Sequence, residues 1–138
     1  MKPSPPSDNA TSILLVDHDL SLREELCETL DADGFATCCA ANRHEALEWL
    51  KQGGISIVIL NMRMPGAESI GTIIAVRAHS SGMKIIAISG GVEQGPDGFL
   101  SLAKSLGATA VLSNPRDRNK LLDTVHGLLS PGLQQMAS

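Results

Sequence analysis

Short apolar runs alternate along the chain with longer segments in which apolar residues recur every three or four positions. A continuous apolar run bounded by turn residues is typical of a strand that is buried on both faces. Such runs occupy residues 13–16, 35–40, 55–60, 84–88 and 109–112. The helical pattern occupies residues 20–30, 45–50, 70–77, 99–106 and 119–129. The repeated alternation predicts an α/β fold, with a parallel sheet that carries helices on both faces.

Local signals mark where some of the predicted helices begin and end. Gly34 and Gly107 each follow a helical segment and are expected to close it in the left-handed conformation. Asn42 is expected to cap the start of the second helix, with Glu45 three residues further on. These signals therefore agree with the hydrophobic pattern on where helices meet turns.

The length and composition of the chain predict a single domain. It has 138 residues, of which 43% are hydrophobic, enough for a normal core. We expect the domain to span residues 12–129, with no output domain after the last helix. Residues 1–11 are rich in Pro and Ser and are predicted to be a disordered tail. Residues 130–138 begin with Ser-Pro-Gly and are predicted to be a C-terminal tail.

Charge, hydropathy and cysteine usage restrict the partners and the compartment. A net charge of −4 and a pI near 5.5 argue against an electrostatic nucleic-acid binder. No apolar run approaches the ~20 residues of a membrane span, and the amino end lacks the apolar segment of a signal peptide. The three cysteines are odd in number and two are adjacent, which does not suggest a disulfide framework. A reduced, cytoplasmic location is therefore expected.

Polar residues stand where the apolar runs end. Asp17, Asn61, Ser89 and Asn114 follow the first, third, fourth and fifth runs. The carboxyl ends of the strands are where ligands bind in open α/β sheets. This edge of the predicted sheet is therefore the candidate functional site.

The segments around these residues resemble the receiver domains of bacterial response regulators. The matching segments are ILLVDHD, NMRMPG, KIIAISGG and GATAVLSNP, in the family's order and spacing. The resemblance covers residues 12–129 and implies a flavodoxin-like fold, with a five-stranded parallel sheet in the order 2-1-3-4-5 and five helices. It also implies bacterial two-component or phosphorelay signalling. The Gly-rich connection that ends at Gly95 resembles a subgroup of receivers that often stand alone.

Some positions keep the residues that the family uses at its phosphorylation site. Asp17 matches the first acidic residue, and Asp19 stands where acidic residues are common but secondary. Ser89 matches the small hydroxyl residue that contacts the phosphoryl group, and Pro115 is also retained.

Other positions depart from the family pattern. His18 occupies the second acidic position, which is normally a main metal contact, and Asn61 replaces the aspartate that accepts the phosphoryl group. Asn114 replaces the lysine, and Val111 stands where many receivers carry an aromatic switch residue. An amide is a poor nucleophile and brings no charge to a metal, so the site is predicted to be degenerate.

These departures shape the expected function. Mg²⁺ prefers clustered anionic oxygens, so we expect its binding to be weak or absent, with Asp17 and Asp19 as the remaining candidates. No catalytic residue is assigned, no cofactor is expected, and the chain is not expected to be an enzyme. It is predicted to be a pseudo-receiver that binds a protein without phosphorylation. The implied partners are a histidine kinase, a phosphotransferase or another regulator.

Two other functions remain open at this point. The first is a working receiver that is phosphorylated at an unusual residue, for which the candidates are Asp17, Asp19 and Ser89. The second is a flavodoxin-like enzyme or nucleotide binder that shares only the fold, although no nucleotide fingerprint is found. A transition-metal site at His18 and Asp17 is a further alternative, but the other histidines are scattered.

Receivers commonly meet partners or dimerise through the fourth helix, fifth strand and fifth helix. On this surface the resemblance points to Phe99, Lys104, Arg118 and Lys120, and a homodimer would use the same face.

The three cysteines are interpreted as core residues. Cys38 and Cys39 are successive strand residues whose side chains should point to opposite faces. Cys27 is expected to share the core face of the first helix with Leu26 and Leu30. All three are interpreted as small buried hydrophobic residues in preference to a redox switch.

Overall fold

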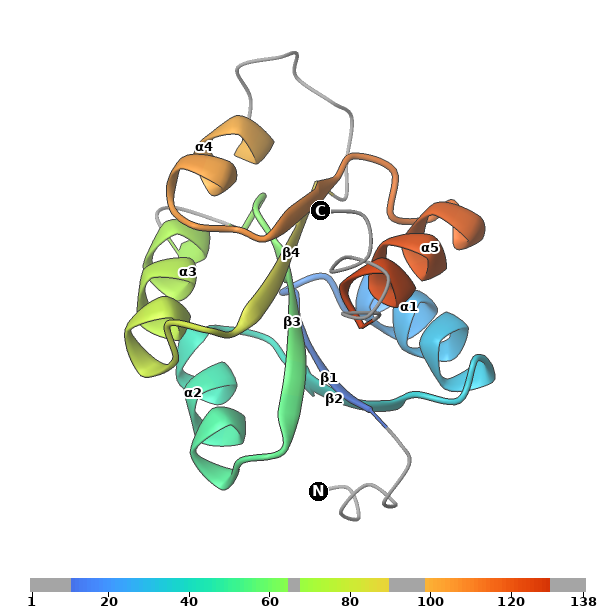
Figure 1. The fold of residues 1–138 in the computed structure, drawn as a ribbon, viewed down its shortest axis with the longest axis horizontal. Coiled ribbons are helices and arrows are strands. Elements are labelled where there is room, and N and C mark those ends of the chain that lie inside the picture. Colours follow the sequence, from blue (N-terminus) through green and yellow to red (C-terminus); the bar gives the residue numbers. More distant parts are fainter. Residues whose placement is uncertain (1–10, 65–67, 90–98, 130–138) are drawn as a thin grey trace, which may run out of the picture.

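The computed structural model describes residues 11–64, 68–89 and 99–129 (Figure 1). Two predicted tails and the Gly-rich connection near Gly95 fall wholly or largely outside these residues. The strands are β1 (Ser12–Val16), β2 (Ala36–Ala40), β3 (Ile55–Asn61), β4 (Lys84–Ile88) and β5 (Ala110–Leu112). The helices are α1 (Leu20–Ala32), α2 (Arg43–Gln52), α3 (Glu68–His79), α4 (Phe99–Ser105) and α5 (Arg118–Leu128).

The strands form one parallel sheet in the order β2-β1-β3-β4-β5. This order and the alternation of elements confirm the predicted fold class. The observed elements differ from the predicted ones by no more than two residues at either end. β3 reaches one residue further than its apolar run, so Asn61 is still paired within the sheet.

The sheet separates two hydrophobic cores. On one face, Leu14 and Leu60 pack with residues of α2, α3 and α4. On the other face, Leu15 and Ile59 pack with α1 and α5 (Figure 1). Side chains of successive strand residues point to opposite faces, so the continuous apolar runs of β1 and β3 supply both cores.

The predicted turn and cap residues are found in their expected roles. Gly34 and Gly107 have φ angles of 95° and 111°, which a residue with a Cβ rarely adopts. The Asn42 side chain accepts a hydrogen bond of 2.9 Å from the backbone nitrogen of Glu45 at the start of α2. The Glu45 carboxylate in turn accepts from the backbone nitrogen of Ala41 at 2.7 Å.

The interpretation of the cysteines as buried core residues is wrong. Cys39 is exposed, and Cys27 and Cys38 are only half-buried. The reason is that β2 is an edge strand, in which only Ala40 is fully buried. Cys27 lies on the flank of α1 that faces this strand, beside the core stripe of the helix.

No helix in the described part of the chain has both the length and the apolar character needed to cross a membrane.

Candidate functional site

The ends of β1 and β3 bring Asp17 and Asn61 together. The Asp17 backbone nitrogen extends the sheet ladder by donating to the Ala40 carbonyl at 3.0 Å. Asn61 is the last residue of β3 and pairs with Ile88 of β4. The exposed fractions of Asp17 and Asn61 are 0% and 3%. Two polar side chains that are far apart in the sequence therefore share a buried position between neighbouring strands.

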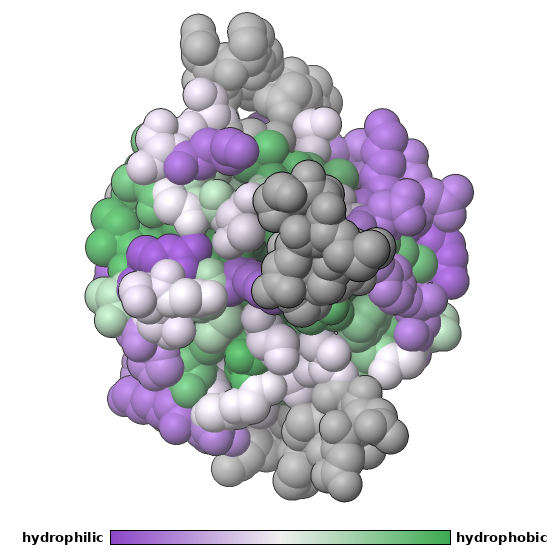
Figure 2. All heavy atoms as spheres, in the orientation of Figure 1, coloured by the Kyte–Doolittle hydropathy of each residue, from purple (hydrophilic) through white to green (hydrophobic). Residues whose placement is uncertain are grey.

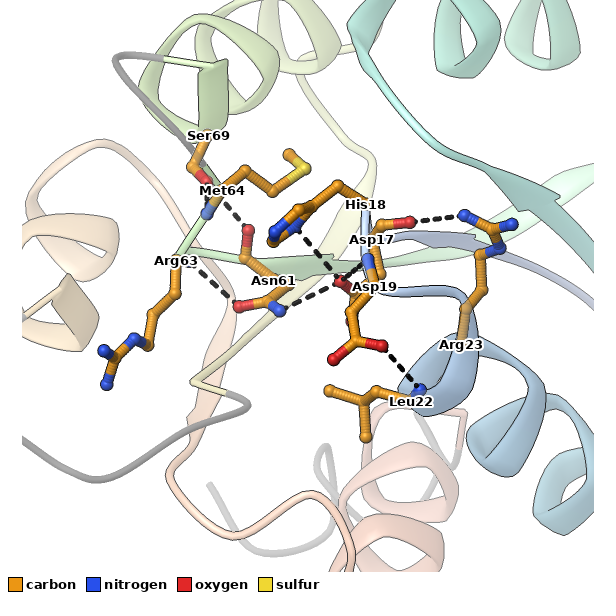
Figure 3. A network of polar contacts seen from close by, with 9 residues as sticks. All are labelled: Asp17, His18, Asp19, Leu22, Arg23, Asn61, Arg63, Met64 and Ser69. Atoms are coloured by element: carbon orange, nitrogen blue, oxygen red, sulfur yellow. Dashed lines mark hydrogen bonds and ion pairs between the residues drawn. The ribbon is translucent and has the colours of Figure 1, made fainter.

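Hydrogen bonds determine how the Asn61 amide is oriented (Figure 3). Its Oδ1 accepts from the backbone nitrogen of Arg63 at 2.9 Å. A backbone N–H can only donate, so the amide oxygen must face Arg63 and the amide nitrogen must face the other way. Nδ2 then donates to Oδ1 of Asp17 at 3.0 Å. An aspartate in place of Asn61 would turn an acceptor toward this carboxylate, and the two would repel each other.

Asp17 has one well-bonded oxygen and one that lacks a partner. Oδ1 accepts from Asn61 and from the backbone nitrogen of Asp19, at 3.0 and 2.9 Å. Among the described residues, Oδ2 of Asp17 is the one buried side-chain oxygen or nitrogen without a hydrogen-bond partner. Burial raises the pKa of Asp17, and the hydrogen bonds from Asp19 and Asn61 offset only part of this effect.

Asp19 and His18 lie at the entrance to α1. The Asp19 side chain caps the helix by accepting from the Leu22 backbone nitrogen at 3.2 Å. The His18 side chain is 45% exposed, and its Nδ1 lies 3.6 Å from Oδ1 of Asp17. Arg23 of α1 donates to the Asp17 carbonyl at 2.6 Å, which holds the first turn of the helix against the end of β1 (Figure 3).

The donor set does not fit Mg²⁺. A hard dication prefers several anionic oxygens, but the buried part of this site offers a single carboxylate, that of Asp17, whose Oδ2 lacks a hydrogen-bond partner. Asp19 is engaged as a helix cap, and Asn61 presents an N–H to the carboxylate. No group of three or more His, Cys, Asp or Glu side chains that could hold a metal ion is found in residues 11–64, 68–89 and 99–129. The same finding weakens the alternative of a transition-metal site at His18 and Asp17.

The remaining predicted site residues lie at the neighbouring strand ends. Ser89 is buried directly after β4, and its backbone nitrogen donates to the Leu112 carbonyl at 3.3 Å. Asn114 follows β5, is exposed, and accepts through its carbonyl from the Asp117 backbone nitrogen at 3.1 Å. Pro115 is buried beside it. The topology thus brings all seven predicted positions to one edge of the sheet, and their functional assignment stays a prediction.

Sequence reasoning assigned neither Ser69 nor Arg23 to this site. Ser69 is buried in the first turn of α3, donates to the Asn61 carbonyl at 2.8 Å, and accepts from the Met64 backbone nitrogen at 3.1 Å. It therefore stabilises the turn that follows β3 (Figure 3). Neither residue stands in a strand-end motif, so the hydrophobic pattern carried no signal for these contacts.

The predicted interaction surface is described in part. Lys104, Arg118 and Lys120 are all exposed, and Val111 of β5 is half-buried. Phe99 is the first residue of α4, but its side chain lies outside the described residues. Arg118 and Lys120 lie in the first turn of α5, next to its cap Asp117.

The model of the response regulator receiver domain family matches residues 13–126. This chain belongs to that family. The swarming motility regulation protein RssB of Serratia marcescens is 31% identical over 116 residues, which are 83% of this chain and 51% of that protein. The sporulation initiation phosphotransferase F of Bacillus subtilis is 26% identical over 113 residues, or 82% of this chain and 89% of that protein. The chain therefore spans about half the length of the Serratia protein.

Solved structures agree with the family assignment. The chemotaxis protein CheY4 of Vibrio cholerae superimposes with a TM-score of 0.75 at 26% identity, covering 85% of this chain and 97% of that one. A CheY-like receiver domain protein from Methanospirillum hungatei has a TM-score of 0.79 at 20% identity, and it supports the fold alone.

The first prediction concerns the buried carboxylate. Asp17→Asn removes an ionisable group whose pKa is raised above its ordinary value of 3.8 by burial. The contribution of Asp17 to the free energy of unfolding is most favourable below its unfolded-state pKa, where the carboxyl is protonated. This contribution is lost as pH rises through the folded-state pKa. The variant should therefore be more stable at neutral pH, by about 1 kcal/mol, and the difference should shrink toward acid pH. Urea unfolding between about pH 4 and pH 8 would measure this. A less stable variant at every pH would contradict it.

The second prediction concerns the amide that faces Asp17. Asn61→Asp places two carboxylates at a distance now joined by a hydrogen bond, so unfolding in EDTA should become easier by about 1–3 kcal/mol. Millimolar Mg²⁺ should restore part of this loss, whereas the natural protein should show no Mg²⁺ dependence. Asn119→Asp, the same change at an exposed residue of α5, is the matched control. Saturable stabilisation of the natural protein by Mg²⁺ would overturn the conclusion about the donor set.

Proposed function

We propose that this receiver domain takes part in two-component signalling by binding a protein partner, without being phosphorylated itself and without acting as an enzyme. The observation that carries the proposal is the Asn61 amide at the acceptor position. Its nitrogen and oxygen are both committed to hydrogen bonds, one with Asp17 and one with Arg63. The lone pair of an amide nitrogen is delocalised, so this group is a poor nucleophile toward phosphorus, and unlike a carboxylate it brings no negative charge to a metal.

The other candidate acceptors are poorly placed for phosphoryl transfer. Asp17 is fully buried, with one oxygen in two hydrogen bonds. Asp19 caps α1, so its modification would compete with the bond to Leu22. Ser89 is 2% exposed. These contacts support the pseudo-receiver over a receiver that uses an unusual acceptor.

The charges around the site support the same proposal. Transfer of a phosphoryl group needs cations to neutralise the oxygens of the group. The position of the family's lysine holds the uncharged Asn114, and the position of a main metal contact holds His18. A site that lacks a nucleophile at the acceptor position and also lacks these charges is better suited to a structural role than to phosphoryl transfer. Membership of the receiver family also argues against the nucleotide-binding alternative.

The surface of α4, β5 and α5 is the proposed site of partner binding. Within the described residues, neither the Arg118 guanidinium nor the Lys120 ammonium is ion-paired, so both are available to an acidic partner. Figure 2 shows hydrophilic residues gathered on the side of the molecule where α1 and α5 lie. The partner would be a kinase, a phosphotransferase, another regulator or a second copy of this chain.

The third prediction tests phosphorylation directly. Incubation with acetyl phosphate and Mg²⁺ should leave the intact mass of the natural protein unchanged, because no accessible carboxylate stands at the acceptor position. The single variant Asn61→Asp should be modified weakly. The triple variant that adds His18→Asp and Asn114→Lys should be modified more, since it also restores the charges.

The control for this experiment is the double variant His18→Asp with Asn114→Lys, in which Asn61 is unchanged. It should remain unmodified, because it regains the charges but not the acceptor. A phosphoryl adduct on Asp17, Asp19 or Ser89 of the natural protein would contradict the proposal and favour a receiver with an unusual acceptor.

The fourth prediction tests the binding surface. Arg118→Glu with Lys120→Glu should weaken capture of a partner identified by pull-down, and capture by the natural protein should not depend on acetyl phosphate. The thermal midpoint should change little, since exposed substitutions are usually nearly neutral. Lys51→Glu, at an exposed residue of α2 on the other side of the sheet, is the matched charge reversal.

A charge reversal on α1 tests whether the partner docks on that helix instead of on α4, β5 and α5. Glu24→Lys suits this purpose because Glu24 is exposed, whereas Arg23 contacts the Asp17 carbonyl and would disturb the site. If capture survives the α5 reversals but fails with Glu24→Lys, the binding face is on α1.

A further inference from the structure

Two thiols lie against each other beside the edge of the sheet. Sγ of Cys27 in α1 and Sγ of Cys39 in β2 are 2.8 Å apart, although the residues are separated by 12 positions in the sequence. A disulfide bond has a length of about 2.05 Å, so the sulfur atoms need to approach by less than about 1 Å. The packing of α1 against β2 therefore holds this pair close to bonding distance.

The two thiols differ in their ionisation. The hydrogen bond from Cys27 lowers the pKa of Cys39, and the positive charge of Arg23 acts in the same direction. Burial and the carboxylates of Asp31 and Glu24 oppose these effects without reversing them. The same hydrogen bond, together with burial, raises the pKa of Cys27. Cys39 is thus the more readily ionised thiol of the pair, and its thiolate is the better nucleophile.

Exposure agrees with this division of roles. Cys39 is exposed on the edge strand, where a small oxidant can reach it, and Cys27 is half-buried behind it. A thiolate that is accessible and lies next to a second thiol has the arrangement of a site that oxidises and then resolves to a disulfide.

We propose that Cys27 and Cys39 form a dithiol that a hydroperoxide oxidises to an intramolecular disulfide. In the first step, the Cys39 thiolate attacks the terminal oxygen of the hydroperoxide, the O–O bond breaks, and the alkoxide (hydroxide in the case of hydrogen peroxide) leaves, so that Cys39 becomes a sulfenic acid. In the second step, the Cys27 sulfur attacks the Cys39 sulfur, the S–O bond breaks, and the thiol proton leaves with the hydroxyl group as water. The two sulfur atoms together lose two electrons, and the peroxide gains them.

Cys38 is excluded from this pair by the geometry of the strand. Successive residues of β2 point to opposite faces, and Cys38 packs with the core on the α2 side, whereas Cys27 packs on the α1 side. Burial also raises the pKa of Cys38. The neighbouring cysteine therefore serves as an internal control that lies on the same strand and points to the opposite face.

The bond would form close to the degenerate receiver site. Cys39 precedes Ala40, whose carbonyl accepts from the backbone nitrogen of Asp17. Arg23, whose charge acts on Cys39, also donates to the Asp17 carbonyl. Oxidation would tie α1 covalently to the edge strand. The inference does not depend on whether the domain is phosphorylated, because it uses none of the strand-end side chains.

The fifth prediction is an oxidation experiment on the reduced, full chain. Hydrogen peroxide should lower the intact mass by about 2 Da, for two hydrogens lost, and dithiothreitol should reverse the change. Cleavage after glutamate separates Cys27 from the other two cysteines at Glu28, so a disulfide-linked peptide pair should appear only in the oxidised sample. The oxidised protein should also unfold at a higher temperature than the reduced one.

Single variants identify the pair. Cys38→Ser should keep the mass loss, whereas Cys27→Ser and Cys39→Ser should abolish it. In Cys27→Ser, which lacks the resolving thiol, dimedone should label Cys39 as a sulfenic acid. The reduced variants should unfold near the temperature of the natural protein, which excludes loss of folding as the cause. The proposal is overturned if Cys38→Ser abolishes the mass loss, if disulfide-linked dimers form instead, or if peroxide leaves all three thiols reduced.

Discussion

The burial of β1 and β3 on both faces is the constraint on which the rest of the structure depends. These central strands are covered by α1 and α5 on one side and by α2, α3 and α4 on the other. From Ile13 to Val16 and from Ile57 to Leu60 every side chain is apolar and buried. The next residues toward the carboxyl ends, Asp17 and Asn61, are polar, appear at the same edge and still lie in buried surroundings. A buried polar group must find a partner nearby, and here each finds the other.

The identity of one side chain then decides what the site can do. With two carboxylates at this position, the edge would hold a concentration of negative charge that needs a cation. With Asn61, the amide N–H supplies the positive end of a dipole, and the carboxylate of Asp17 is partly satisfied from within the protein. The remaining cost is the unpartnered Oδ2 and the raised pKa of Asp17. These contacts make the site a buried polar cluster, and uncharged Asn114 and His18 stand where the family carries a lysine and an acidic residue.

The thiol pair arises from a different part of the same architecture. An edge strand has a neighbour on only one side, so β2 leaves its side chains more exposed than those of the central strands. α1 packs beside this edge and brings Cys27 to Cys39. Arg23 lies between the two regions, since it contacts the end of β1 and acts on the charge of Cys39. The proposed dithiol therefore lies next to the polar cluster at the strand ends.

Much of this could be predicted from the sequence, because hydrophobic periodicity and strand-end motifs are local signals. The strand order follows from the family motifs, Asn61 ends β3 as expected, and Gly34, Gly107 and Asn42 mark the turns and caps. The orientation of the Asn61 amide could not be predicted, because it depends on a backbone N–H at Arg63 and on a carboxylate from another strand. The environment of Cys27 could not be predicted either. Helical periodicity locates a residue to within a turn of the core face, but only the packing of α1 against an edge strand decided that its thiol meets Cys39.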